Sequence, residues 1–163
     1  MEEHKKEVHI EYELDAPRAL VFAAWTDPKH LEKWYAPEGC SITIKHMDVR
    51  EGGRYHMKID NPQFGPCWTR GSFTELRPPE KLVITMTFAD EADRFVDPSA
   101  MGMKSGWPKE TVLTVTFEDL GERTRLRLHQ SVSEALAIQT GAHPSWINML
   151  GRLRNLVESI QGN

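Results

Sequence analysis

The sequence has little cysteine, no long hydrophobic run and no excess of positive charge. It holds two cysteines in 163 residues, Cys40 and Cys67, and they form no C-x-x-C pair. We expect both thiols to be reduced, because a chain of this length builds a core without disulfides. No apolar stretch approaches the ~20 residues that cross a bilayer. The amino-terminal segment MEEHKKEVHI lacks an apolar signal core. These absences predict a cytoplasmic protein that does not enter membranes.

Charge and motif content exclude further classes of protein. The chain has 20 Lys+Arg against 24 Asp+Glu, a formal net charge of −4, so no basic excess attracts it to nucleic acid. No two of the seven histidines lie four residues apart on a predicted helix, and H-E-x-x-H does not occur. No glycine-rich phosphate-binding motif is present either. We therefore expect no metal and no cofactor.

The hydrophobic pattern predicts one α+β domain over residues 1–163, with its core at about 8–160. Residues 8–14 alternate as a half-buried strand does, and two short helices, 19–25 and 29–35, follow Pro17 and Pro28. A period of two then predicts five or six antiparallel strands, with segments at 41–49, 54–59, 68–76, 82–88, 111–117 and 124–132. A long amphipathic helix from about Pro144 to Ile160 ends the chain. The predicted order is β-α-α-β(5-6)-α, a curved antiparallel sheet wrapped around a long C-terminal helix.

One connection in this pattern is unusually long. Residues 89–109 join two predicted strands, with an acidic front at Asp90, Glu91 and Asp93 and an apolar tail that ends near Trp107. Loops of this length in compact domains are usually functional or disordered. We predict that the loop acts as a lid.

Several motifs, in order along the chain, resemble those of a known family: DAPR at 15–18, AWTDP at 24–28, DVREGGR at 48–54, GSFTEL at 71–76 and PPEKL at 78–82. Over about residues 8–158 the chain resembles the bacterial branch related to the C-terminal domain of the activator of the heat-shock-protein-90 ATPase. That branch belongs to the START/polyketide-cyclase (SRPBCC) superfamily. The resemblance implies a helix-grip (START/Bet-v-1-like) fold, with a cavity between the sheet and the C-terminal helix that binds a small hydrophobic or aromatic molecule. It does not imply one reaction.

Aromatic, methionine and polar side chains on positions that could face inward are the candidate ligand contacts. Plain core packing is the alternative interpretation of the apolar ones, and a one-residue change of strand register would exchange the two faces of the sheet. The candidates are Trp34, His46, Tyr55, His56, Met57, Trp68, Arg70, Met86, Phe88, Trp107, Trp146 and Leu150.

Other functions remain open at this stage. A cyclase- or hydrolase-like enzyme could use the same cavity if an acid or base with a perturbed pKa faced it, and Asp48, Glu75, His46 and Arg70 are the candidates. The family resemblance also suggests a module that stimulates a chaperone ATPase in a stress response. A homodimer is open as well, although the sequence shows no dedicated interface.

Overall fold

The computed structural model describes residues 6–102 and 106–161. These residues form seven strands in one antiparallel sheet, with the order β1-β7-β6-β5-β4-β3-β2. The strands are β1 (Glu7–Leu14), β2 (Ser41–Met47), β3 (Arg54–Asn61), β4 (Gly65–Arg77), β5 (Lys81–Ala89), β6 (Thr111–Asp119) and β7 (Thr124–Ser133). The helices are α1 (Arg18–Thr26), α2 (Pro28–Trp34), α3 (Glu134–Thr140) and α4 (Ala142–Gln161), with a short 3-10 helix η1 (Pro98–Met101).

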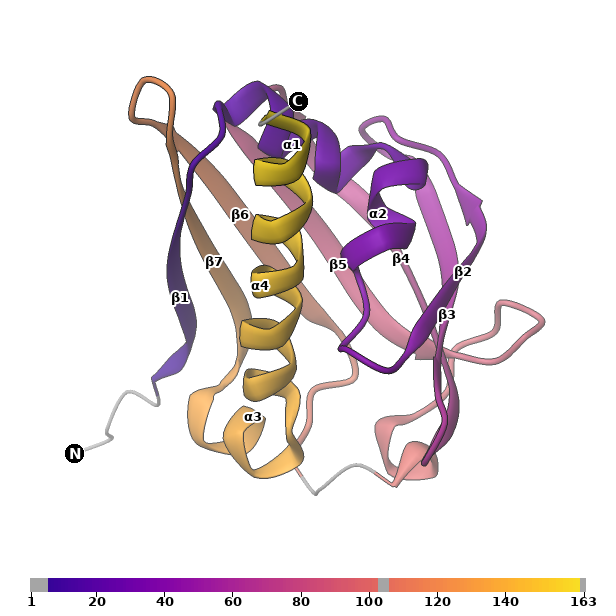
Figure 1. Ribbon diagram of the computed structural model, residues 1–163. Helices are drawn as coiled ribbons and strands as arrows, with labels where there is room; N and C mark the ends of the chain where they lie inside the picture. The colour runs from indigo at the N-terminus through magenta and orange to yellow at the C-terminus, as the bar shows by residue number, and fades with distance from the viewer. Residues whose placement is uncertain (1–5, 103–105, 162–163) are drawn as a thin grey trace.

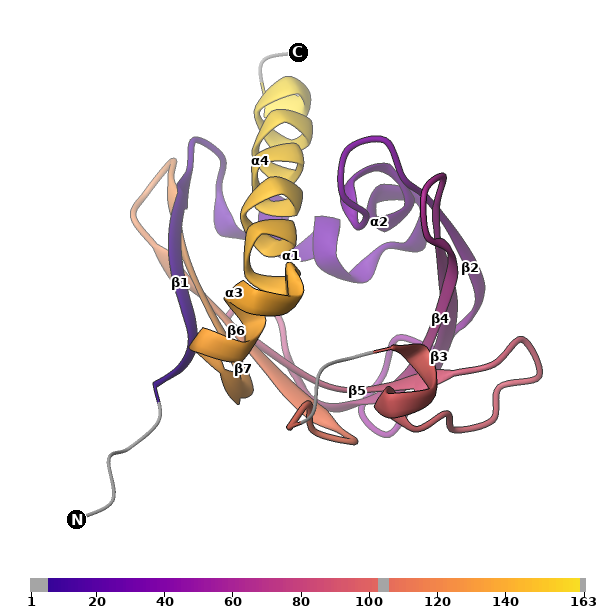
Figure 2. The ribbon, with the colours of Figure 1, turned by 90° about the horizontal axis from the view of Figure 1, so that it is seen from below.

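The sheet curves around α4 (Figure 1). Seen from below, the strands form a U-shaped wall, and α1 and α2 close the side opposite the sheet (Figure 2). The predicted helix-grip fold and element order are thus confirmed, with six strands after the first two helices.

A local sequence signal explains where α2 begins. The Asp27 side chain accepts a hydrogen bond from the backbone N–H of Lys29 and caps α2, which begins at Pro28. The buried side chains of α4 recur at helical spacing and face the sheet: Trp146, Met149, Leu150, Leu153 and Val157.

The β3–β4 connection differs from the predicted loop at 61–66. The two strands pair as far as Asn61 and Gly65, so the turn between them comprises only residues 62–64. Gly65 takes a positive φ of 88°, which a residue with a side chain rarely adopts, and the Asn61 side chain accepts hydrogen bonds from Gln63 and Phe64. Because the turn is this tight, the two strands remain paired through most of the segment 61–66, which the sequence, with Pro62 and Pro66, predicted to be a loop.

Two glycines differ in how closely neighbouring elements approach them. A Cβ at Gly71, in β4, would lie 1.8 Å from the Thr85 carbonyl oxygen and 2.7 Å from the Tyr55 ring. A Cβ at Gly151, in α4, would meet only the Tyr12 hydroxyl at 3.7 Å, an ordinary contact. The sheet therefore requires a glycine at the first position and the helix does not require one at the second.

Candidate functional site

A cavity of about 470 Å³ opens between the sheet and the first turns of α4. Its walls come from β3, β4, β5, the ends of β6 and β7, the segment before β6 and the start of α4. The lining includes Tyr35, Ile59, Phe64, Cys67, Thr69, Met86, Phe88, Trp107, Lys109, Thr111, Gln130, Ala142, Ser145, Trp146 and Met149. The α4 residues that line the cavity belong to the part of the helix that directly follows α3, and Figure 1 shows this part of α4 on the concave side of the sheet.

Strand alternation selects which residues face this cavity. Ile59 on β3 lies opposite Cys67 on β4, and both line the cavity. Thr69 on β4 pairs with Phe88 on β5, and both of these line it as well. Because successive side chains point to opposite faces, the intervening positions of β3 and β4 face away, whereas three consecutive residues of β5, Met86 to Phe88, border the cavity. Small residues on the inner face of β4 leave the space that larger ones would fill.

A chain of buried polar groups forms part of the cavity wall. The Trp146 indole Nε1–H donates to the Gln130 side-chain oxygen at 2.9 Å, and the Gln130 amide donates to the Thr111 hydroxyl at 3.2 Å. All three side chains are at most 5% exposed. This buried polar chain, Thr111–Gln130–Trp146, joins α4 to β6 and β7 without placing a charge in the cavity.

Among the residues that the structure describes, the titratable groups that line the cavity are Tyr35, Cys67 and Lys109. Burial raises the pKa of the Cys67 thiol and raises that of the Tyr35 phenol well above its usual value. Both groups therefore stay protonated near neutral pH. Lys109 is exposed, and its ammonium lies 3.9 Å from Asp97.

A second, much smaller cavity of about 20 Å³ lies deeper in the fold. Tyr35 borders both cavities, and Trp25, Tyr55 and Met57 border the inner one. The Tyr55 hydroxyl donates to the Thr85 carbonyl oxygen at 3.0 Å. The indole Nε1–H of Trp25 is buried without a hydrogen-bond partner in the described part of the chain.

The structure brings some of the residues expected from the sequence together. Met86, Phe88, Trp107 and Trp146 line the main cavity. Tyr55 and Met57 line the inner one. Trp34 and Leu150 are fully buried in the core and border neither cavity, and the Trp34 indole donates to the Ala24 carbonyl oxygen.

Four expected residues lie on the opposite face of the sheet. In β3 and β4, His56 pairs with Arg70 and Lys58 pairs with Trp68, positions that alternate with the cavity-facing ones. The His56 ring stacks on Trp68 with centroids 4.7 Å apart. His46 pairs with His56 from the neighbouring β2 and is exposed. None of these four side chains lines the cavity.

The acid–base candidates are engaged elsewhere. Arg70 forms an ion pair with Asp93 at 2.8 Å, Glu75 pairs with Arg77, and Asp48 pairs with Arg50. No carboxylate or histidine lines the cavity within the described residues.

The long connection between β5 and β6 contacts both faces of the sheet. Its front is fixed to the outer face, where the Asp90 carbonyl oxygen accepts a hydrogen bond from His56 and that of Glu91 accepts one from Lys45. The backbone N–H of Arg94 donates to the Asp90 carboxylate and is the main cause of its lowered pKa. Trp107–Lys109 line the cavity instead. The predicted lid thus divides into two parts, and 103–105 lie outside the described residues.

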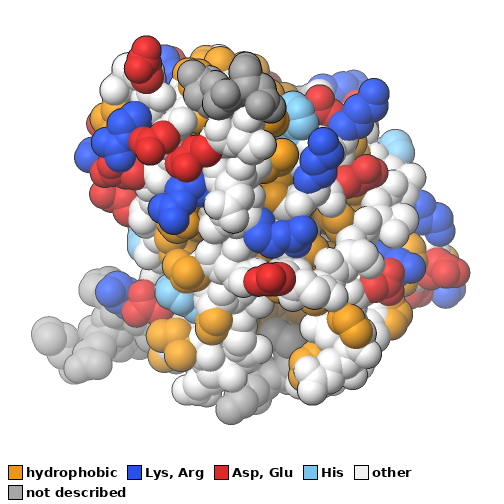
Figure 3. Space-filling view, viewed as in Figure 1, with side chains coloured by type: hydrophobic (Ala, Val, Ile, Leu, Met, Phe, Trp, Pro, Cys, Tyr) orange, Lys and Arg blue, Asp and Glu red, His pale blue; other side chains and the backbone are white. Residues whose placement is uncertain are grey.

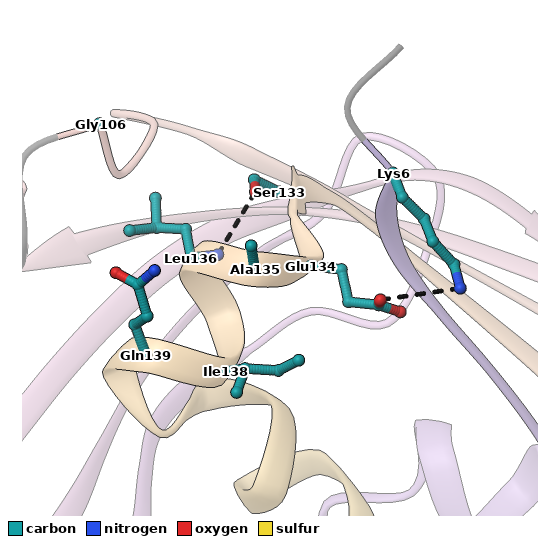
Figure 4. Close-up of a pocket in the computed structure, with 8 residues that line it drawn as sticks. All are labelled: Lys6, Gly106, Ser133, Glu134, Ala135, Leu136, Ile138 and Gln139. Atoms are coloured by element: carbon teal, nitrogen blue, oxygen red, sulfur yellow. Dashed lines mark hydrogen bonds and ion pairs between the residues drawn. The ribbon is translucent and has the colours of Figure 1, made fainter. Parts of the chain in front are cut away.

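Two other surface hollows have polar groups that already serve the fold. One, about 510 Å³, lies beside α3 (Figure 4). There the Ser133 hydroxyl caps α3 through the Leu136 N–H, and the Lys6 ammonium lies 3.7 Å from Glu134. The other lies by β1 and the end of α4, where charged side chains gather in Figure 3 and Arg123 pairs with Glu13.

Within the described ranges, no three His, Cys, Asp or Glu side chains are grouped so that they could hold a metal ion. In the same part of the chain, no helix has the length and apolarity needed to span a membrane.

Comparison with known proteins matches the fold and the sequence to one family. The profile described as "Activator of Hsp90 ATPase homolog 1-like protein" matches residues 15–158. A crystal structure of a Chromobacterium violaceum protein is 27% identical, with a TM-score of 0.75, over 93% of this chain and 96% of that one. The AHSA1 protein of Silicibacter pomeroyi is 19% identical, with a TM-score of 0.72, over 94% and 98%. At that identity the likeness shows the fold alone. No curated protein matches the sequence.

Proposed function

Since the chain belongs to the family of Activator of Hsp90 ATPase homolog 1-like proteins, we propose that it binds a small hydrophobic or aromatic molecule between the sheet and α4. The observation that carries this proposal is the cavity of about 470 Å³. Cavities of roughly 300–1,000 Å³ hold small organic ligands.

The chemistry of the lining supports an apolar ligand. Aromatic and methionine side chains from three parts of the fold supply the contact surface: Phe88, Trp107, Trp146, Met86 and Met149. Such side chains adapt to flat, irregular molecules. The few polar groups are mostly hydroxyls and amides, which orient a ligand without requiring it to be charged.

Acid–base catalysis in this cavity has less support. The cavity-lining phenol and thiol have raised pKa values and are poor bases near neutral pH. We therefore propose binding, not turnover, as the activity of this site.

The first experiment is native mass spectrometry on gently purified protein, followed by denaturing extraction of any retained small molecule. It is paired with titration of the uncharged fluorescent probe N-phenyl-1-naphthylamine. The blocking variant is Ser145→Trp, which adds a large ring at the cavity wall, and the matched control is Ile147→Trp, at an exposed position of the same helix.

We expect the probe to bind the unmodified protein and the Ile147→Trp variant alike, and Ser145→Trp to bind at least about tenfold more weakly because the added ring occupies the cavity. Equal binding by all three proteins would show that the probe sits elsewhere. Absence of binding to the unmodified protein, together with no retained molecule, would contradict the proposed function.

A further inference from the structure

Tyr35 occupies a special place in the site because it borders both cavities. It ends α2, where its backbone N–H donates to the Leu31 carbonyl oxygen. Its ring makes edge contacts with the indoles of Trp25, Trp34 and Trp146, at centroid distances of 6.1, 5.3 and 5.9 Å. Indole rings on three sides fix the direction of the phenol.

The Tyr35 hydroxyl has no hydrogen-bond partner among the described residues, although the side chain is only 8% exposed. The neighbouring Tyr55 differs, because its hydroxyl donates to Thr85. The hydroxyl is not one of the fully enclosed polar atoms that lack a partner, so it reaches space that water can enter, and the main cavity offers such space beside this side chain. The hydroxyl is therefore available to a molecule in the cavity.

A second unpaired donor belongs to Trp25, which borders the inner cavity together with Tyr35. The Trp25 side chain is 1% exposed and borders the inner cavity, and its indole N–H is unpartnered. An indole N–H only donates, and a protonated phenol donates as well. The complement of two free donors is an acceptor, such as a carbonyl oxygen.

The charges around the main cavity restrict the ligand further. Lys109 is the one charged side chain among the described residues that line it, and it is exposed. An ionised ligand deep in the cavity would lose its hydration without gaining an ion-pair partner. The cavity thus favours uncharged molecules.

We propose that the ligand is an uncharged aromatic molecule that carries an acceptor oxygen, and that this oxygen accepts a hydrogen bond from the Tyr35 hydroxyl at the inner end of the cavity. This inference rests on the proposed function, since it concerns how the same cavity selects among apolar molecules. Tyr35 is then the residue that sets both the orientation and the polarity of the bound ligand.

The test uses two probes with the same bicyclic frame, 1-tetralone, which has a ketone oxygen, and tetralin, which has none. Their dissociation constants are measured by displacement of N-phenyl-1-naphthylamine from the unmodified protein, from Tyr35→Phe and from the control Tyr12→Phe. Tyr12 lies on β1 and does not line the cavity. The comparison is the ratio of the tetralin constant to the tetralone constant in each protein, which cancels the different water solubilities of the probes.

We expect the ratio to fall about 3- to 10-fold in Tyr35→Phe, the worth of one neutral hydrogen bond, and to stay unchanged in Tyr12→Phe. Tetralin binding should change little in either variant, which also shows that Tyr35→Phe is folded. If both probes bind to the Ser145-lined cavity but the ratio is the same in all three proteins, the role of Tyr35 is refuted and the proposed function stands. If neither probe displaces the dye, the proposed function itself fails.

Discussion

Replacing Gln130 with leucine tests whether the buried polar chain holds α4 to the sheet. The substitution leaves the Trp146 indole N–H without its acceptor, which costs about 1–3 kcal/mol for a buried group. It also removes the bond to Thr111, worth about 0.5–1 kcal/mol. Leucine gains some apolar burial, and a water in the adjoining cavity can take over part of the lost bonding. We therefore expect a net loss of about 2 kcal/mol in the free energy of unfolding.

Urea denaturation followed by circular dichroism measures this loss directly, and the melting temperature should fall by about 4–8 °C. The matched control is Gln139→Leu, the same chemical change at an exposed position of α3, where we expect an effect within about 0.5 kcal/mol. Combining Gln130→Leu with Trp146→Phe removes donor and acceptor together, and the double variant should be about 1 kcal/mol more stable than additivity predicts. Equal stability of the two leucine variants would refute the reasoning, because the buried indole would then need no partner.

Three further outcomes follow from contacts described above. Gly71→Ala should lower the free energy of unfolding by about 2–3 kcal/mol, and Gly151→Ala should raise it by about 0.5–1 kcal/mol, both measured by urea denaturation. A Gly71→Ala variant as stable as the parent would contradict the close approach of the Thr85 carbonyl oxygen to Gly71. Burial raises the pKa of the Cys67 thiol. Alkylation of Cys67 by iodoacetamide, followed by peptide mass spectrometry, should therefore accelerate only above the pH at which an ordinary thiol ionises. Bound N-phenyl-1-naphthylamine should slow the alkylation of Cys67 but not that of Cys40. Hydrogen bonds within its turn, above all from the Arg94 backbone N–H, lower the pKa of Asp90. The stabilisation that its carboxylate gives is therefore present above the ordinary carboxyl pKa and is lost as the pH falls through the lowered value. NMR titration of the Asp90 carboxyl should show a midpoint below about 3.9, and a midpoint at or above that value would contradict this account.

The sequence predicts the fold well because the hydrophobic periodicity and the turn and helix-start residues agree along most of the chain. In β7, buried Leu126, Leu128 and Gln130 alternate with more exposed residues as expected. In α4 the apolar stripe leaves no doubt about which side faces the sheet. These patterns depend only on neighbours within one element, so they can be read before the tertiary structure is known.

The sequence does not predict in the same way which side chains of β4 point toward the core. Each face of this strand carries one aromatic residue, Trp68 on the outer side and the buried Phe73 on the inner side. Hydrophobicity alone therefore does not choose between the two registers, and a bulge between Phe73 and Glu75 interrupts the alternation. Trp68 is accommodated outside because His56 stacks on it, a contact that depends on strand pairing.

Sequence reasoning also missed the residues that create the cavity. It sought large apolar side chains, whereas a cavity needs positions where side chains are small, and Cys67, Thr69, Ala142 and Ser145 are such positions. Tyr35 was missed because it ends a helix and so takes part in no periodic pattern. A side chain that borders two cavities is a property of the folded chain, which only the assembled structure reveals.

The division of the concave face between an aromatic cluster and an open cavity bears on how readily this chain can acquire new ligands. Trp25, Trp34 and Phe117 pack together near α1 and border no part of the main cavity. Random substitution at Thr69 or Met86 should therefore diversify what the protein accepts while leaving its folding intact. Tyr35 and Trp146 belong to both regions. A library for directed evolution would hold those two constant, together with Thr111 and Gln130 of the buried polar chain, and vary the other lining positions.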